Sequence, residues 1–177
     1  MVKDKGYERV LARCAELSVE PTMHALYISL GEQKLTHYNA GKPMSQYDCR
    51  FGINPPSCVE NSLGTPTGLH FIDEKVGQGA PSGMVFIGRV PQRCYWEYST
   101  EETKNFVTSR ILWLRGLEPG HNAGPGCDSH ERYIYIHGTN QEDTFETARS
   151  HGCVILRNAD VIALFDAVPS GSQVLIE

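Results

Sequence analysis

The sequence has no cluster of basic residues and no long apolar run. It contains 177 residues, with 16 Lys and Arg against 21 Asp and Glu, and carries a net charge of −5. Nucleic acid is not an expected partner, because neutralising phosphates requires clustered Lys and Arg. No uncharged stretch approaches the roughly 20 apolar residues of a transmembrane helix. Repeats, low-complexity tracts and linkers are missing too, so we expect one globular domain with a sizeable core.

The N-terminal residues lack the apolar segment of a secretory signal. Residues 1–15 mix acidic and basic side chains with scattered apolar ones, which does not match a signal peptide. Two interpretations follow. Either the protein stays in the cytoplasm, or a leader has been removed from it. The oligomeric state cannot be inferred from these features.

Six cysteines are present, but their spacing is not that of a disulfide framework, and a chain of this size does not depend on one. We expect most of them to be reduced. They are Cys14, Cys49, Cys58, Cys94, Cys127 and Cys153.

Two helices are predicted. The first covers residues 3–17, where apolar residues recur at helical spacing before Pro21, and it forms a helical extension at residues 1–22. The second begins at Asn158, which we expect to be its N-cap, with Asp160 in the first turn. Its apolar stripe consists of Val161, Leu164, Phe165 and Val168.

The remainder is predicted to be mainly β, with peripheral helices. Residues 25–30 and 34–39 alternate apolar and polar side chains around a three-residue connection, which indicates a hairpin. Three further segments are rich in β-branched and aromatic residues and are predicted to be central strands. They cover residues 84–90, 110–115 and 132–136, and a closing strand covers residues 173–176.

Reactive side chains concentrate between residues 133 and 157. A strand at residues 133–136 delivers His137 to its end, and Cys153 follows sixteen residues later within the sequence SHGCV at 150–154. A thiol becomes a nucleophile when a base removes its proton, and an imidazole can serve as that base. His137 and His151 are both candidates for the base.

The residues around Cys153 suggest how it would be presented. If the segment is extended, His151 and Cys153 point to the same face of a strand. Gly152 would then remove a side chain where a substrate comes close, and the Cys153 N–H could face a developing oxyanion.

Two other interpretations of these residues stay open at this point. A cysteine after a glycine can simply be a small buried apolar residue. A zinc site is chemically possible as well, although the only close pairs are one Cys-x-x-His and one His-x-Cys. Its ligands would come from Cys127, His130, His137, His151 and Cys153, whereas His24, His37, His70 and His121 are expected to be structural.

The sequence IHGT at residues 136–139, followed at this distance by SHGCV at 150–154, resembles the signature of the L,D-transpeptidases of the YkuD (ErfK/YbiS/YcfS/YnhG) family. The likeness extends to TPTG at 65–68, to the strand at 110–114 and to the helix start at 157–161. It covers residues 23–177, which we therefore expect to form the catalytic domain.

The resemblance implies a mixed β-sandwich with short peripheral helices, and a bacterial cysteine acyltransferase that acts on peptidoglycan stem peptides or muropeptides. Cys153 would attack the carbonyl of the diamino acid at stem position three and expel D-Ala, and an amine of a second stem would resolve the thioester. His137 matches the family's base, oriented by the carbonyl of Gly138. His151 and Ser150 match the support positions of the motif, and the N–H groups of Gly152 and Cys153 match the oxyanion donors. No cofactor and no metal are implied.

The same resemblance suggests contacts to the substrate from four further residues. They are Ser150, Arg157, Thr139 and Tyr135. A leader removed in maturation would place the protein in the periplasm or cell wall, where it would form cross-links. A cytoplasmic protein would instead trim recycled muropeptides.

One departure concerns the position two residues after the nucleophile. Many members of the family have arginine there, whereas this chain has Ile155, and Arg157 lies two residues further on. In a continuous strand Arg157 would share the face of Cys153 and could partly substitute, about 6 to 7 Å along the strand. We expect Ile155 to be partly exposed, so that Ile155→Arg would change substrate preference. A transpeptidase, a hydrolytic L,D-carboxypeptidase and an inactive binder of wall fragments all remain compatible with the sequence.

Overall fold

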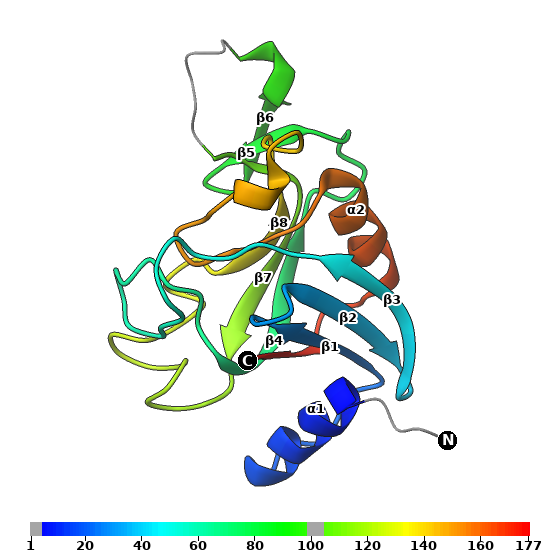
Figure 1. The fold of residues 1–177 in the computed structure, drawn as a ribbon, viewed down its shortest axis with the longest axis vertical. Helices are drawn as coiled ribbons and strands as arrows, with labels where there is room; N and C mark the ends of the chain where they lie inside the picture. Colours follow the sequence, from blue (N-terminus) through cyan, green and yellow to red (C-terminus); the bar gives the residue numbers. More distant parts are fainter. Residues whose placement is uncertain (1–4, 99–104) are drawn as a thin grey trace.

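The computed structural model describes residues 5–98 and 105–177 (Figure 1). The prediction of a mainly β fold with peripheral helices is confirmed. The strands form one continuous mixed sheet in the order β3-β2-β1-β10-β4-β7-β5-β6, and β8 pairs with β7 and with β9. Neither helix in the described part of the chain is long and apolar enough to cross a membrane.

The elements of the first half are α1 (Lys5–Glu16), β1 (His24–Ser29), β2 (Lys34–Asn39), β3 (Lys42–Asp48), β4 (Gly68–Val76), β5 (Met84–Ile87) and β6 (Val90–Cys94). Those of the second half are β7 (Val107–Gly116), β8 (Tyr135–Gly138), β9 (Val154–Ile155), α2 (Asn158–Ala167) and β10 (Gln173–Ile176). Two short 3-10 turns, η1 (Tyr95–Glu97) and η2 (Phe145–Thr147), complete the chain.

Alternation along β1 divides the core between the two faces of the sheet. Leu26 and Ile28 point into the main core, which contains the buried face of α2, whereas Ala25 belongs to a second cluster. That second cluster includes Val10 and Cys14 of α1. Figure 1 shows α1 and α2 at separate places against the strands. The first helix is therefore packed onto the sheet and contributes to the core, and the predicted residues 3 and 4 of this helix lie outside the described part.

The predicted strand at residues 84–90 is wrong in one respect, because the chain turns inside it. Gly88 and Arg89 have φ values of +54° and +67°, which is the backbone of a two-residue turn with positive φ at both central positions. The segment is consequently the hairpin β5–β6. Its second strand lies at an end of the sheet order, and it is not central.

Two strands begin and end differently from the prediction. β7 is longer than residues 110–115 and contains an irregularity between Thr108 and Ile111, where Ser109 has a φ of +64°. β8 begins only at Tyr135, since Tyr133 has a φ of +56° and cannot continue a strand. The polar strand β3 was not predicted, and neither was β4.

Asn158 is not the N-cap that the sequence suggests. Arg157 occupies that position, and Asn158 is the first helical residue, 2% exposed. Its amide donates to the carbonyl of Thr139 at 2.8 Å, and its oxygen accepts from the hydroxyls of Thr108 and Ser109 at 2.6 Å each. This side chain joins the start of α2 to β7 and to the chain just after His137.

Candidate active site

Cys153 lies beside the first residue of β8. Parallel pairing of β8 with β9 sets Ile136 opposite Val154, so the residue before Val154 comes next to Tyr135. The Cys153 sulfur accepts from the Tyr135 N–H at 3.4 Å and donates to the Tyr133 carbonyl at 3.4 Å. Burial raises the pKa of this thiol to about 11, although the Tyr135 N–H and the charge of Arg132 oppose the shift. The thiol is therefore protonated at neutral pH.

His137 lies on the same strand as Tyr135 and two residues further along, so both side chains project from one face. It is 2% exposed, and burial lowers its pKa to about 4. Its Nδ1 is 2.6 Å from the carbonyl oxygen of Gly138. A carbonyl can only accept, so Nδ1 carries the proton and Nε2 of this neutral imidazole is a lone-pair acceptor. The contact to Gly138 is the one expected from the sequence.

The segment before Cys153 is not extended. Gly152 has a φ of +125°, a conformation that L-residues with side chains rarely adopt. A Cβ at this position would approach the carbonyl oxygen of Gly64 and Ile134 Cδ1 to 3.0 Å each. The space beside Gly152 is thus filled by the protein itself. The shared face expected for His151 and Cys153 is not supported, and His151 is exposed on the loop.

The Ser150 side chain forms two hydrogen bonds inside the loop that carries Cys153. Its hydroxyl donates to the Cys153 carbonyl at 2.7 Å and accepts from the Gly152 N–H at 3.0 Å. The Gly152 N–H is therefore occupied in this structure. Of the two expected oxyanion donors, only the Cys153 N–H makes no hydrogen bond to another described residue.

Ile155 is fully buried, which contradicts the expectation of partial exposure. It packs with Phe145 and Ala148 in a small apolar cluster, and its backbone exchanges hydrogen bonds with Arg50 at 2.8 and 2.9 Å. Position 155 faces the protein interior, because β9 is covered there by the segment around η2.

Arg157 does not bring its charge to position 155, which Ile155 occupies. Its guanidinium carbon lies 4.3 Å from the centre of the Phe145 ring, and it donates to the Glu142 carbonyl at 3.1 Å. Glu146 pairs with it at 3.4 Å and forms a second ion pair with the buried Arg50. The suggestion that Arg157 substitutes for the missing arginine is therefore not supported.

Thr139 is also buried, with no exposed surface. Its hydroxyl donates to Asn105 at 3.1 Å and accepts from the Gln141 N–H at 3.0 Å. These bonds order the chain after His137, so the structure gives Thr139 a supporting position and does not support direct contact with a substrate.

The aromatic side chains near Cys153 were not predicted from the sequence to form a group. Tyr135 accepts a hydrogen bond from Arg89 at 3.1 Å, and the Arg89 guanidinium lies 4.4 Å from the centre of the Trp113 ring. Tyr133, whose carbonyl accepts from the Cys153 thiol, is 54% exposed. Arg89 sits at the tip of the β5–β6 hairpin, so its position depends on a turn that the sequence analysis did not locate.

The proposed zinc ligands do not come together. Cys127 donates to backbone carbonyls at 3.5 and 3.6 Å, and His130 stacks on Trp113 with the ring centres 3.9 Å apart. Within residues 5–98 and 105–177, no group of three or more His, Cys, Asp or Glu side chains is placed to hold a metal ion.

A second cysteine–histidine pair lies on the surface. The Cys58 sulfur is 3.5 Å from His121 Nε2, and the Thr67 hydroxyl is 3.1 Å from the same nitrogen. His121 was expected to be structural, and nothing in the sequence linked it to a thiol across 63 residues. Any measurement of thiol reactivity must consequently separate Cys58 from Cys153.

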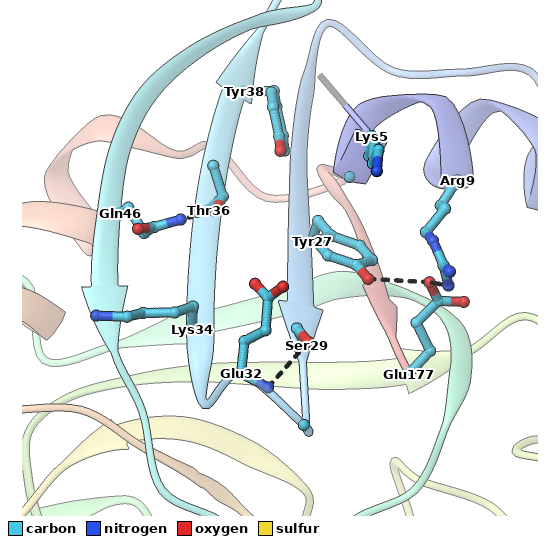
Figure 2. A pocket seen from close by; sticks show the side chains of 12 residues that line it. Lys5, Arg9, Tyr27, Ser29, Glu32, Lys34, Thr36, Tyr38, Gln46 and Glu177 are labelled. Carbon is cyan, nitrogen blue, oxygen red and sulfur yellow. Dashed lines mark hydrogen bonds and ion pairs between the residues drawn. The ribbon is translucent and has the colours of Figure 1, made fainter. Parts of the chain in front are cut away.

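A pocket of about 690 Å³ lies between α1 and the hairpin strands β1–β3 (Figure 2). Within it Tyr27 donates to Glu177 at 3.0 Å, and Arg9 forms an ion pair with the same carboxylate. None of the residues that line it belongs to the predicted site. This pocket is separate from the thiol and the buried histidine.

The mixed sheet thus holds the cysteine loop against the strand that bears His137. The model of the YkuD family, described as the L,D-transpeptidase catalytic domain, matches residues 24–176. The chain belongs to this family, and the resemblance drawn from its motifs is confirmed.

Similar proteins bear out the fold. An L,D-transpeptidase of Enterococcus faecium has a TM-score of 0.53 at 16% identity, over 89% of this chain and 50% of that one. One of Xylanimonas cellulosilytica has a TM-score of 0.52 at 19% identity, over 89% of this chain and 62% of that one. In Bacillus subtilis, YqjB, provisionally named an L,D-transpeptidase, is 44% identical over 45 residues, or 26% of its length. This chain thus spans less than two thirds of the length of each of these relatives.

Proposed function

We propose that the protein is a cysteine-dependent L,D-transpeptidase acting on peptidoglycan stem tetrapeptides. Cys153 attacks the carbonyl of the residue at stem position three, and the terminal D-Ala leaves as a free amine. An amine of a second stem then attacks the thioester, which forms a 3-3 cross-link and releases the thiol.

The observation that carries this proposal is the state of the two central side chains. A protonated thiol sits at the start of β8, and a neutral imidazole with its Nδ1–H directed to the Gly138 carbonyl projects from the same face of that strand. His137 Nε2 takes the proton of Cys153 as the sulfur attacks, and then gives it to the departing D-Ala nitrogen. The Cys153 N–H is the donor available to the oxyanion.

Hydrolysis of the same thioester is the second candidate function. It requires the same residues and differs only in whether water or an amine reaches the acyl group. Cys153 is partly exposed, which leaves water an approach to the acyl group. A third candidate, an inactive binder of wall fragments, predicts that Cys153 never forms a thioester.

The deciding experiment incubates the purified protein with disaccharide-tetrapeptides and identifies products by mass spectrometry. A cross-linked dimer that requires Cys153 supports the transpeptidase, and tripeptide with free D-Ala alone supports the carboxypeptidase. Cys153→Ala is the inactive control, and Cys58→Ala is the matched control for the other cysteine–histidine pair. Products that persist in Cys153→Ala would contradict the whole assignment.

The compartment is a further proposal. Cross-linking fits the periplasm or cell wall after removal of a leader, and muropeptide trimming fits the cytoplasm. Fractionation of cells carrying the full-length gene product, followed by immunodetection, decides between them.

A further inference from the structure

Arg132 lies where the nucleophile loop meets another segment of the chain. Its guanidinium donates to the Ser57 carbonyl at 3.1 Å and to the Gly64 carbonyl at 2.8 Å. The Nη2 atom that donates to Gly64 also lies close to Gly152. It is 3.4 Å from the point that a Cβ atom would occupy if residue 152 had a side chain. The guanidinium therefore joins residues 57–64 to the residue immediately before Cys153.

The partners of this cation are unusual for a half-buried arginine. Its hydrogen bonds go to the Ser57 and Gly64 carbonyls and the Ser62 hydroxyl, and no ion pair involves it within the described residues. Burial lowers the pKa of Arg132, and Cys58, Cys153 and Cys127 act against that shift, followed by Glu60. The thiol of Cys153 is thus among the groups that interact electrostatically with this cation.

Two other arginines near the cysteine loop form ion pairs and ring contacts away from Cys153. Arg157 pairs with Glu146 and covers Phe145, and Arg50 is buried on the far side of β9 with the same carboxylate. Arg132 is the cation whose charge lowers the pKa of Cys153. The titratable groups of β8 are Tyr135, whose pKa burial raises, and His137, whose pKa burial lowers to about 4, so both are uncharged at neutral pH.

We propose that Arg132 is a positioning residue that fixes the Cys153 loop against residues 57–64 and stabilises the thiolate of Cys153 by its charge. This inference rests on the proposed role of Cys153 as the nucleophile. It assigns the stabilising cation to a residue 21 positions before the cysteine in sequence, and not to positions 155 or 157.

The test measures alkylation of Cys153 by iodoacetamide between pH 6 and 11, with the modified peptide quantified by mass spectrometry so that Cys58 and Cys127 are counted separately. Three variants separate charge from hydrogen bonding. Arg132→Lys keeps the charge, Arg132→Gln keeps donors for the Ser57 and Gly64 carbonyls without the charge, and Arg132→Met removes both. Arg149→Met is the matched control, because Arg149 is exposed on the same loop and donates to the Ala148 carbonyl at 2.7 Å.

We expect Arg132→Gln and Arg132→Met to slow alkylation at pH 8 by about 5- to 10-fold and to move the midpoint of the profile upward, as loss of a nearby opposite charge requires. Arg132→Lys should restore most of the rate, and Arg149→Met should match the unaltered protein. An unchanged profile in Arg132→Gln, or a Lys variant no faster than Gln, would overturn the inference. If Arg132→Met does not fold, the comparison of Lys with Gln still decides.

Alkylation needs no peptidoglycan, so the two proposals fail in different ways. A shifted profile without any product from tetrapeptides would keep the role of Arg132 at the thiol and refute the transpeptidase. Normal turnover together with an unchanged alkylation profile would support the transpeptidase and refute the role of Arg132.

Discussion

Cys153 and His137 are both uncharged at neutral pH, for the same physical reason. Burial disfavours a charge on either group, so it raises the pKa of the thiol to about 11 and lowers that of the imidazole to about 4. A resting ion pair of thiolate and imidazolium is consequently not the stable form of this site. The proton must move as the sulfur attacks, and the orientation of His137 by Gly138 decides whether it can.

The pH profile of the reaction follows from these two values. We expect release of D-Ala to be lost as the pH falls through about 4, because protonated His137 cannot accept a proton. The rate should stay high from pH 6 to 9, where the imidazole is neutral. Initial rates of D-Ala release from pH 3 to 10 test this. The substitution His137→Gln should lower the rate by at least about 100-fold. A profile that falls through pH 6 to 7 would mean that His137 titrates at its ordinary value.

Burial of Ile155 changes the expected effect of an arginine there. Ile155→Arg places a charge in a buried apolar cluster beside Phe145 and next to Arg50. We expect a loss of about 3 kcal/mol or more in the free energy of unfolding. Ile155→Val, which removes one methylene, should cost about 1 kcal/mol. Urea denaturation measures both, and a stable arginine variant with altered substrate preference would contradict the packing.

At the scale of elements, one side chain connects α2 with β7 and with the chain just after β8. Asn158 connects the first turn of α2 with the hydroxyls of β7 and with the Thr139 carbonyl, two residues after His137. The orientation of His137 therefore depends on a residue outside the catalytic pair.

We expect Asn158→Ala to lower the free energy of unfolding by about 2 kcal/mol, since it leaves two hydroxyls and a carbonyl without their partner. Turnover should fall as well, through disorder of residues 138 and 139. Asn54→Ala is the control, because Asn54 is exposed and makes a single bond of 2.9 Å to the Ser62 carbonyl. Thermal denaturation and D-Ala release are the measurements, and equal effects of the two substitutions would refute this role.

The elements that could be predicted from sequence are those whose local pattern agrees with their burial. The alternation in β1, whose Leu26 and Ile28 lie in the main core, and the apolar stripe of α2 are of this kind. β3 was missed because most of its side chains are exposed and polar. Asn158 was assigned as N-cap because asparagine favours that position, whereas tertiary hydrogen bonds use its side chain.

The candidate site divides in the same way. Cys153, His137 and the contact to Gly138 could be predicted, since motif and strand place them. The cation beside the cysteine loop could not, because Arg132 reaches residue 152 through a turn at Tyr133 and through carbonyls of a loop 68 and 75 residues away. Likewise, Arg89 enters the site by a hairpin that only the backbone reveals.

At the scale of the whole molecule, α1 is attached to the sheet by a buried carboxylate. Glu118 is 4% exposed, accepts from the Leu69 N–H at 2.6 Å and pairs with Arg13 of α1. Burial acts to raise the pKa of Glu118, but the hydrogen bonds from Arg13 and Leu69 outweigh it and lower that pKa below 4.5.

Glu118→Gln should therefore destabilise the protein by about 2 kcal/mol at pH 7, where the charge-assisted bonds are present. A lowered folded-state pKa gives stability that is complete above the unfolded value and disappears as the pH falls through the folded one. The difference between the two proteins should shrink below about pH 4.5. Urea denaturation at pH 7, 5 and 3.5 measures it, and a difference that is constant over this range would contradict the ion pair.

The pairing of β1 with β10 also determines when the sheet can be completed during synthesis. Ala25 pairs with Gln173, and β10 lies between β1 and β4. A ribosome that has made every residue of the cysteine loop has still not made the strand that joins the two parts of the sheet. Until residues 173–176 emerge, the edges of β1 and β4 that pair with β10 have no partner strand. Termination before residue 173 would consequently leave a chain whose sheet stays open at its middle.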